Sequence, residues 1–188
     1  YEFRIRRPDG EERSLQTSAT TVTYKGEPAA LAVVRDITDE KKVQEEIRRL
    51  ALAVSTTNDG VLLVGLDGRI FFVNPAAARI FAYGTDEMLG LEVFRLHPEQ
   101  TAETKARDIF NQTLEGGWVG EFVGVRKTGN EFPMRLSTSL MRDEEGKPIG
   151  IVSITTDITV QKNAESENAR LFMEAQQASA VAQALLGT

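Results

Sequence analysis

The chain repeats part of itself at long range. Residues 2–50 align with residues 121–171, and each copy holds three β-forming runs, the tripeptide Asp-Ile-Thr and a polar, helix-forming run. The offset is 119 to 121 residues, the length of one domain with its linker. Only residues 58–157 contain both halves of such a domain. We therefore interpret residues 1–37 as the end of a preceding copy, and the chain, which does not begin with Met, as a piece of a longer protein.

The front half of the complete copy predicts a hairpin followed by short helices. Asp67-Gly68 is a strong turn signal between β-forming runs at 61–66 and 69–74. Asn74 followed by Pro75 is typical of a helix N-cap and first helical position. Further helices are expected at 85–89 and 101–114.

The back half predicts three strands, at 118–126, 131–141 and 149–156. In the middle strand apolar residues and Thr138 alternate with Pro, Arg and Ser, the period of a sheet with one buried face. The expected fold class is α+β, with a five-stranded antiparallel sheet, short helices on one face and long flanking helices. The expected parts are truncated strands, a linker helix, a complete domain and a C-terminal helix, at 1–38, 39–57, 58–158 and 159–188.

Composition excludes several kinds of site. The chain has no cysteine and one histidine, which removes disulfides, thiolate zinc sites, cysteine nucleophiles and sites with two histidines. No metal site is expected. No glycine-rich phosphate loop or Ser-His pair is present, so no catalytic residue is assigned and no enzyme activity is expected within this chain.

Charge and hydropathy limit the partners. The net charge of −6 argues against nucleic acid or an anionic membrane as a partner, because phosphates require a basic face. No apolar run approaches the ~20 residues of a membrane span. We expect a cytoplasmic protein with no direct membrane insertion.

Four ordered motifs carry a family resemblance. They are Asp67–Ala76 (DGRIFFVNPA), Phe81–Gly90 (FAYGTDEMLG), Leu96–Glu99 (LHPE) and Gly117–Glu121 (GWVGE), and Asp157-Ile158-Thr159 closes the segment. In this order and spacing they resemble a PAS domain. The resemblance implies an input domain of a signalling protein, usually dimeric, in which a curved sheet and helices form a small pocket and strand shifts pass into a C-terminal helix.

The resemblance places a candidate ligand pocket between the sheet and the helices. Its expected lining comes from two helices and the inward positions of the last three strands: Phe81, Phe110, Trp118, Phe122, Phe132, Met134, Leu136, Ser153 and Thr155. A packed core with no ligand is the alternative, because apolar residues at a period of two are core first.

The sequence does not identify a cofactor, and a domain without any cofactor is the favoured expectation. The lack of cysteine excludes the thiol–flavin photochemistry of the light-sensing branch of the family. A flavin held as a redox probe stays open, with Ser153 and Thr155 at its edge. His97 is the one candidate haem ligand, but Pro98 should break any helix that would aim its imidazole into the pocket, and haem is not expected.

Both copies end in the same acid–hydroxyl junction. Asp36 and Thr38 in the first copy correspond to Asp157 and Thr159 in the second. Each threonine is expected to cap the following helix, and each aspartate to bond the strand, the helix or a nearby cation. The resemblance implies that this junction relays a signal from the sheet to the helix.

The two helix-forming runs carry apolar stripes at heptad spacing. The stripe before the complete domain is Val43, Ile47, Leu50 and Val54, and the one after it includes Leu171, Ala175, Ala178, Ala182 and Leu185. These stripes predict a weak, homodimeric coiled coil, or amphipathic helices that pack on their own sheet.

The combined interpretation is a signal-input PAS module of a larger protein. The expected output domain, in the same polypeptide, is a sensor histidine kinase or a cyclic-dinucleotide enzyme. The module would bind a small ligand or cofactor and relay a change through Asp-Ile-Thr. A ligand-free dimerisation and spacing module and a flavin-based redox sensor are the alternatives.

Overall fold

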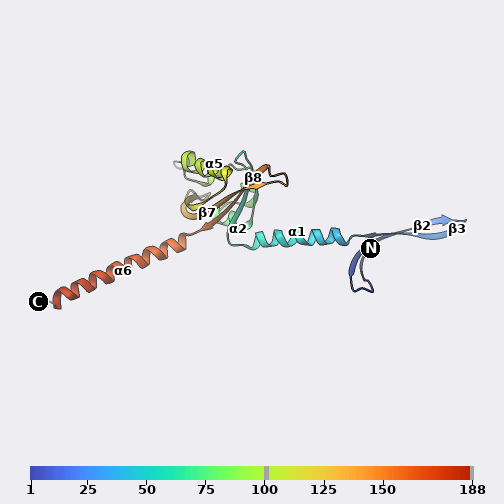
Figure 1. The fold of residues 1–188 in the computed structure, drawn as a ribbon, viewed down its shortest axis with the longest axis horizontal. Coiled ribbons are helices and arrows are strands. Elements are labelled where there is room, and N and C mark those ends of the chain that lie inside the picture. The colour runs from blue at the N-terminus through green and yellow to red at the C-terminus, as the bar shows by residue number, and fades with distance from the viewer. Residues whose placement is uncertain (100–101, 187–188) are drawn as a thin grey trace. The chain divides into compact units, whose positions relative to one another are not determined.

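The computed structural model describes residues 1–99 and 102–186 and contains two compact units, residues 1–53 and 54–188 (Figure 1). The second unit is built on a five-stranded antiparallel sheet of order β5-β4-β8-β7-β6. Its strands are β4 (Gly60–Val64), β5 (Ile70–Val73), β6 (Trp118–Val125), β7 (Glu131–Arg142) and β8 (Pro148–Asp157).

Short helices connect β5 to β6, and a long helix follows β8. They are α2 (Pro75–Phe81), α3 (Thr85–Met88), the 3-10 turn η1 (Val93–Leu96), the π-helical turn η2 (Ala102–Ala106), α5 (Arg107–Glu115) and α6 (Thr159–Leu186). In Figure 1, α2 and α5 lie beside the sheet, where they pack against β4 and β7. The expected α+β fold is confirmed, and the helix expected at 101–114 is divided between η2 and α5.

One face of the sheet forms the core. Along β7, Phe132, Met134, Leu136 and Thr138 are buried, while the residues between them are half-buried or exposed, as the alternation predicted. They pack with apolar residues of β4, β5, α2, α3 and α5. β4 and α2 approach so closely that a Cβ on Gly60 would lie 3.0 Å from the Ala77 Cα.

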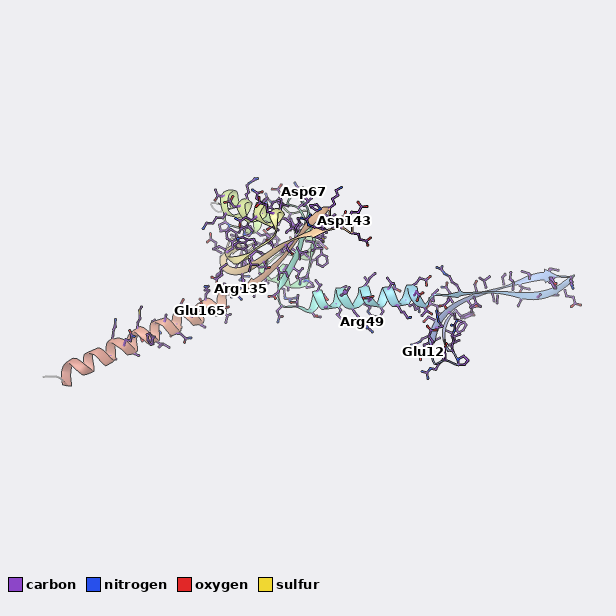
Figure 2. The ribbon with its side chains drawn as sticks, viewed as in Figure 1. Glu12, Arg49, Asp67, Arg135, Asp143 and Glu165 are labelled. Atoms are coloured by element: carbon purple, nitrogen blue, oxygen red, sulfur yellow. The ribbon has the colours of Figure 1, made fainter. Side chains whose placement is uncertain are left out.

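The sheet has two distinct ends. Figure 2 shows Asp67 and Asp143, which sit in the β4–β5 and β7–β8 turns, at one end of the sheet, and Arg135 toward the other end, where α6 begins. Arg135 pairs with Thr156 across β7 and β8, next to the junction with α6. The helix therefore starts at the end of the sheet opposite these two turns.

The first unit is a three-stranded antiparallel sheet of order β1-β2-β3, formed by β1 (Glu2–Arg6), β2 (Glu12–Tyr24) and β3 (Glu27–Asp36). Helix α1 (Thr38–Thr56) follows β3, with Asp39 and Glu40 in its first turn, where negative charge suits the helix dipole. Among the described residues, no helix combines the length and the apolar character needed to cross a membrane.

Candidate functional site

A small cavity lies between the sheet and the helices of the second unit. Its volume is about 40 Å³, space for about three waters or one very small molecule. The wall is mostly apolar and comes from β4, α2, η1, η2, α5, β7 and β8: Leu62, Val64, Phe81, Val93, Phe94, Leu96, Ala106, Ile109, Phe110, Met134, Leu136 and Ile151.

Five polar side chains complete the wall: His97, Thr113, Thr138, Ser153 and Thr155. The Thr113 and Thr138 hydroxyls are hydrogen-bonded to each other at 2.5 Å, and Thr113 Oγ1 also donates to the Ile109 carbonyl at 2.7 Å. Ser153 and Thr155 lie two residues apart on β8 and are both buried. The cavity is therefore an apolar space with a band of neutral hydroxyls along β7, β8 and α5.

His97 is among the residues of this wall, although no helix passes through Pro98, because η1 ends at Leu96 as the helix break predicted. Residue 97 follows η1 in an extended conformation, and its ring lies 4.8 Å from that of Phe122. Burial lowers the pKa of His97 to about 4, and a hydrogen bond to the Val123 carbonyl, with Nδ1–O at 3.3 Å, opposes the shift only in part. The imidazole is neutral at pH 7.

Six of the nine residues proposed for the pocket line the cavity, namely Phe81, Phe110, Met134, Leu136, Ser153 and Thr155. Three do not. Phe132 is buried behind the wall, edge-on to Phe81 with ring centroids 5.6 Å apart. Trp118 and Phe122 pack on each other and against the core from β6, with ring centroids 6.4 Å apart.

The residues of this cavity do not fit a flavin. Pockets for cofactor-sized molecules are roughly 300–1,000 Å³, far more than the 40 Å³ here. Trp118 and Phe122, the expected aromatic lining residues from β6, are not in the wall, and the Thr113 and Thr138 hydroxyls already bond each other. In the described residues no group of three or more Asp, Glu or His side chains is placed to hold a metal ion.

Asn74 ties the end of α1 to the domain core. It is 1% exposed, and its Oδ1 accepts from the Ala77 amide at 2.9 Å, which makes it the N-cap of α2, and from the Val61 amide at 2.8 Å. Its Nδ2 donates to the carbonyls of Val54, in the last turn of α1, and Asp59, each at 2.9 Å. All four hydrogen-bonding positions of this side chain are occupied.

The junction between β8 and α6 is organised by Asp157. Its Oδ1 accepts from the Thr159 amide at 2.9 Å and from the Thr159 hydroxyl at 2.5 Å. Its Oδ2 lies 2.5 Å from Arg126 Nη2. One carboxylate thus joins the last strand, the first residue of α6 and the end of β6.

Arg126 connects this junction to the core and was not predicted from the sequence. Its guanidinium lies over the Phe132 ring, 4.1 Å from the centroid, and its Nη1 donates to the Ile80 carbonyl of α2. Phe132 in turn contacts Phe81 of the cavity wall. A chain of contacts therefore runs from the cavity through Phe81, Phe132 and Arg126 to Asp157.

The carboxyl of Asp157 is ionised at neutral pH. Partial burial by itself raises its pKa, but the hydrogen bonds from Thr159 and the ion pair with Arg126 outweigh that effect and hold the pKa below its usual range. Next to it, the Thr156 hydroxyl donates to Asp59 Oδ1 at 2.7 Å. The segment that follows α1 is therefore also bonded to the strand end that leads into α6.

The junction of the first unit has the same construction. Asp36 Oδ1 accepts from the Thr38 amide at 3.0 Å and from its hydroxyl at 2.5 Å. These bonds, the largest influences on Asp36, hold its pKa low. Its cation is Arg13 of β2, whose Nη1 lies 3.2 Å from Asp36 Oδ2.

The expectation that Thr38 and Thr159 are N-caps is wrong. The first helical amides, of Lys41 and Lys162, donate to the carbonyls of Ile37 and Ile158, so these isoleucines occupy the N-cap position. Each threonine is the first residue of its helix, and its hydroxyl donates to the preceding aspartate. The aspartate therefore holds the helix start.

The proposed dimer stripes are exposed in the single chain. Val43, Ile47 and Leu50 of α1 and Leu171 of α6 are large apolar side chains in solvent, Ala175 and Ala178 are exposed as well, and Val54 is half-buried. The side chains of Ala182 and Leu185 lie outside the described residues.

Comparison with known proteins identifies the family. A model of the PAS domain matches residues 58–160, more than half of the chain, and the chain therefore belongs to the PAS domain family. The match covers the five-stranded sheet, the cavity and the junction with α6.

Solved structures show the same fold. A PAS domain from Colwellia psychrerythraea is 22% identical with a TM-score of 0.57, and covers 61% of this chain and 98% of its own. A PAS domain of an HTR-like protein from Haloarcula marismortui is also 22% identical, with a TM-score of 0.53, over 64% of this chain and 98% of its own. An RNA-binding Light-Oxygen-Voltage receptor is 12% identical with a TM-score of 0.57, over 92% of this chain and 81% of its own.

Among curated proteins, the cell-division control histidine kinase PdhS of Brucella suis is similar to this chain. It is 23% identical over 197 residues, which include 93% of this chain and 19% of PdhS. The chain spans about a fifth of the length of the curated relatives that it matches. The similarity therefore extends beyond the residues matched by the PAS model.

Proposed function

We propose that residues 58–158 are the sensor part of a larger signalling protein, and that a very small, neutral and largely apolar ligand enters its cavity and alters the start of α6. The observation that carries the proposal is the line of contacts from the cavity wall to Asp157. A change in packing at Phe81 reaches Phe132, which supports the Arg126 guanidinium. Arg126 in turn bonds the carboxylate that holds the first turn of α6.

The wall limits the ligand class. Most of it is apolar, and the hydroxyls of Ser153 and Thr155 can bond one neutral polar atom. A charged ligand would lose its hydration without a paired charge, because His97, the only ionisable side chain among the described residues of the wall, is neutral at pH 7. The proposed ligand therefore has only a few non-hydrogen atoms and no charge.

The output lies outside this chain, which we propose has no catalytic role of its own. Similarity to PdhS over most of the chain supports a histidine kinase in the same polypeptide as the output domain. The exposed stripes on α1 and α6 support pairing with a second copy, because coiled-coil linkers expose such stripes until they pair. A PAS domain between two such helices would transmit a change in its core packing to both helices.

A ligand-free dimerisation and spacing module is the second candidate. It is favoured by the small cavity and by the network of Asn74 and Asp59, which bonds the end of α1 to the strand that leads into α6 without involving the cavity. Under this function the domain would transmit a change from α1 to α6 rather than detect a ligand.

Xenon, which binds in dry apolar cavities, separates the two functions. Under xenon pressure, the methyl NMR signals of Leu62, Leu136 and Ile151 should shift in a saturable way. The variant Ser153→Leu, which places a larger side chain in the cavity, should lose these shifts, while Ser139→Val on the exposed face of β7 should keep them. Absence of any saturable shift in the unmodified protein would contradict the ligand-binding function and favour the spacing module.

A further inference from the structure

The three-stranded sheet of the first unit has the same strand register as β6-β7-β8 of the PAS domain. Phe3 pairs with Leu15 as Phe122 pairs with Met134, and Leu15 pairs with Asp36 as Met134 pairs with Asp157. The match continues along β3. Thr17 pairs with Val34, Ala19 with Ala32 and Thr21 with Ala30 in the first unit, and the corresponding pairs of the PAS domain are Leu136 with Thr155, Thr138 with Ser153 and Leu140 with Ile151. The offsets, 119 in β1 and β2 and 121 in β3, are those of the sequence repeat.

One face of this sheet matches the buried face of the PAS sheet. At the positions that line the cavity or pack beside it in the PAS domain, the first unit has one charged residue, Arg13, the counterpart of Phe132. The other residues there are uncharged: Phe3, Leu15, Thr17, Ala19, Thr21, Ala30, Ala32 and Val34. The opposite face carries the charged residues Glu2, Arg4, Arg6, Glu12, Glu27 and Arg35, together with the exposed Leu31 and Val33. This distribution is typical of a sheet with one covered face.

In the PAS sheet, β8 is paired on both sides. On the side away from β7 it pairs with β4, with Leu62 opposite Ser153 and Val64 opposite Ile151. In the first unit the corresponding edge of β3 pairs with no strand among the described residues, and Val34, the counterpart of buried Thr155, is 56% exposed. A long unpaired edge beside an exposed apolar face is uncommon in a finished domain.

A third observation comes from Arg13. Its Nε is buried and has no hydrogen-bond partner in the described part of the chain, although its terminal nitrogens contact Asp36 and Glu11. In the PAS domain the guanidinium that contacts the junction aspartate, that of Arg126, also donates to a carbonyl of α2. The Nε of Arg13 is a buried donor, and the described residues 1–53 of the first unit contain no counterpart of α2 whose carbonyl could accept from it.

We infer that residues 1–37 are the C-terminal half of a second PAS domain, and that its other half is the occupant of this face and edge. The occupant is a segment preceding Tyr1 in the natural polypeptide: a hairpin and short helices, the counterpart of residues 58–117. One of its strands pairs antiparallel with β3 at Ala30–Val34, as β4 pairs with β8, and its helices cover Phe3, Leu15 and Val34. The inference rests on the register and not on the proposed ligand.

Hydrogen exchange tests this by comparing the 188-residue chain with the natural polypeptide extended upstream of Tyr1. The amides of Ala30–Val34 should exchange at least about 100-fold more slowly in the longer protein, while those of Ile151–Thr155, already paired with β4, should be unchanged. Equal exchange of Ala30–Val34 in both proteins would overturn the inference. So would slow exchange in the 188-residue chain that depends on its concentration, because a second copy would then occupy the face.

A pair of substitutions provides the matched control. Val34→Lys places a charge on the face proposed to be covered, and Val33→Lys places it on the opposite face, where the counterpart Ile154 is 41% exposed. In the longer protein Val34→Lys should lower the melting temperature of the first domain by about 10 °C more than Val33→Lys. In the 188-residue chain the two should be equivalent. Equal effects of both substitutions in the longer protein would contradict the inference.

Discussion

Arg126 Nη2 lies 2.5 Å from Asp157 Oδ2, and the same guanidinium stacks on Phe132. This ion pair joins the core of the PAS domain to the residue that holds the start of α6. It is partly buried, with about a quarter of each side chain exposed, whereas the ion pair of Lys162 with Glu121 nearby is more exposed. Removing each pair in turn therefore compares the effect of a partly buried ion pair on stability with that of an exposed one.

Removing the guanidinium should destabilise the domain and loosen α6. Arg126→Ala is expected to lower the free energy of unfolding by about 1–3 kcal/mol, because it leaves the Asp157 carboxylate partly buried without its cation and uncovers Phe132. Lys162→Ala, which removes exposed ion pairs with Glu121 and Glu165, should cost clearly less, because solvent screens exposed charges. Urea unfolding measures both, and equal losses would contradict the special position of Arg126.

Asn74 should be among the most sensitive positions of the PAS domain. Asn74→Ala removes four hydrogen bonds of a buried side chain and leaves the Val54 and Asp59 carbonyls without their donor. The expected loss is about 2–4 kcal/mol. Asn130→Ala, in the exposed β6–β7 turn, should change stability by less than about 0.5 kcal/mol. A small effect of Asn74→Ala would show that water replaces this network.

Stability should depend on pH through His97. Its pKa is about 4 in the folded protein and about 6.5 in an unfolded chain. The unfolded state therefore binds the proton more tightly, so stability is complete above pH 6.5 and falls as the pH decreases toward 4. Between pH 7 and 4 the unmodified protein should lose about 3 kcal/mol more than His97→Gln, measured by urea unfolding at several pH values. Parallel pH profiles of the two proteins would place His97 in solvent.

Asp157 also contributes stability that is lost as the pH falls, but over a lower pH range than His97. Its folded pKa is below the usual range, so its contribution is complete above the unfolded pKa of about 4 and is lost as the pH falls through the lower folded value. The protection factor of the Thr159 amide, its intrinsic exchange rate at each pH divided by the observed rate, should therefore fall at acid pH in the unmodified protein. In Asp157→Asn the protection factor should already be low at pH 7, and strong protection in that variant would rule out the carboxylate as the group that holds the helix.

The stripe on α6 predicts cross-links between copies. Single cysteines at Leu171 or Ala178 should form disulfides between two chains under mild oxidation, because both positions lie on the heptad stripe. Met173→Cys, also exposed but off the stripe, should cross-link much less. Non-reducing electrophoresis provides the measurement, and equal yields at all three positions would indicate random collision.

The sequence predicted the fold because its signals are local. The alternation along 131–141, the Asp67-Gly68 turn and the Asn74-Pro75 helix start each depend on neighbouring residues. The π-helical turn at Ala102–Ala106 was not predicted, because its period departs from an α-helix over only a few residues.

The site was predicted less completely because it is formed by residues that are far apart in the sequence. Arg126 and Asp157 are 31 residues apart, and the repeat would have misled here, since the counterpart of Arg126 is Arg7 whereas Asp36 pairs with Arg13. The helix break at Pro98 gave no sign that His97 would line the cavity, which it does in the extended conformation that follows η1. The volume of the cavity depends on how side chains pack, which no spacing pattern records.

The central claim is that a molecule in the cavity changes the environment of the Thr159 amide, and that Arg126 transmits this change. The direct measurement is the amide NMR signal of Thr159 under xenon pressure, in the unmodified protein and in Arg126→Ala. The account predicts that xenon shifts the cavity methyl signals in both proteins but shifts the Thr159 amide only when Arg126 is present. A Thr159 signal that stays fixed while xenon fills the cavity of the unmodified protein, or that moves equally in both, would contradict it.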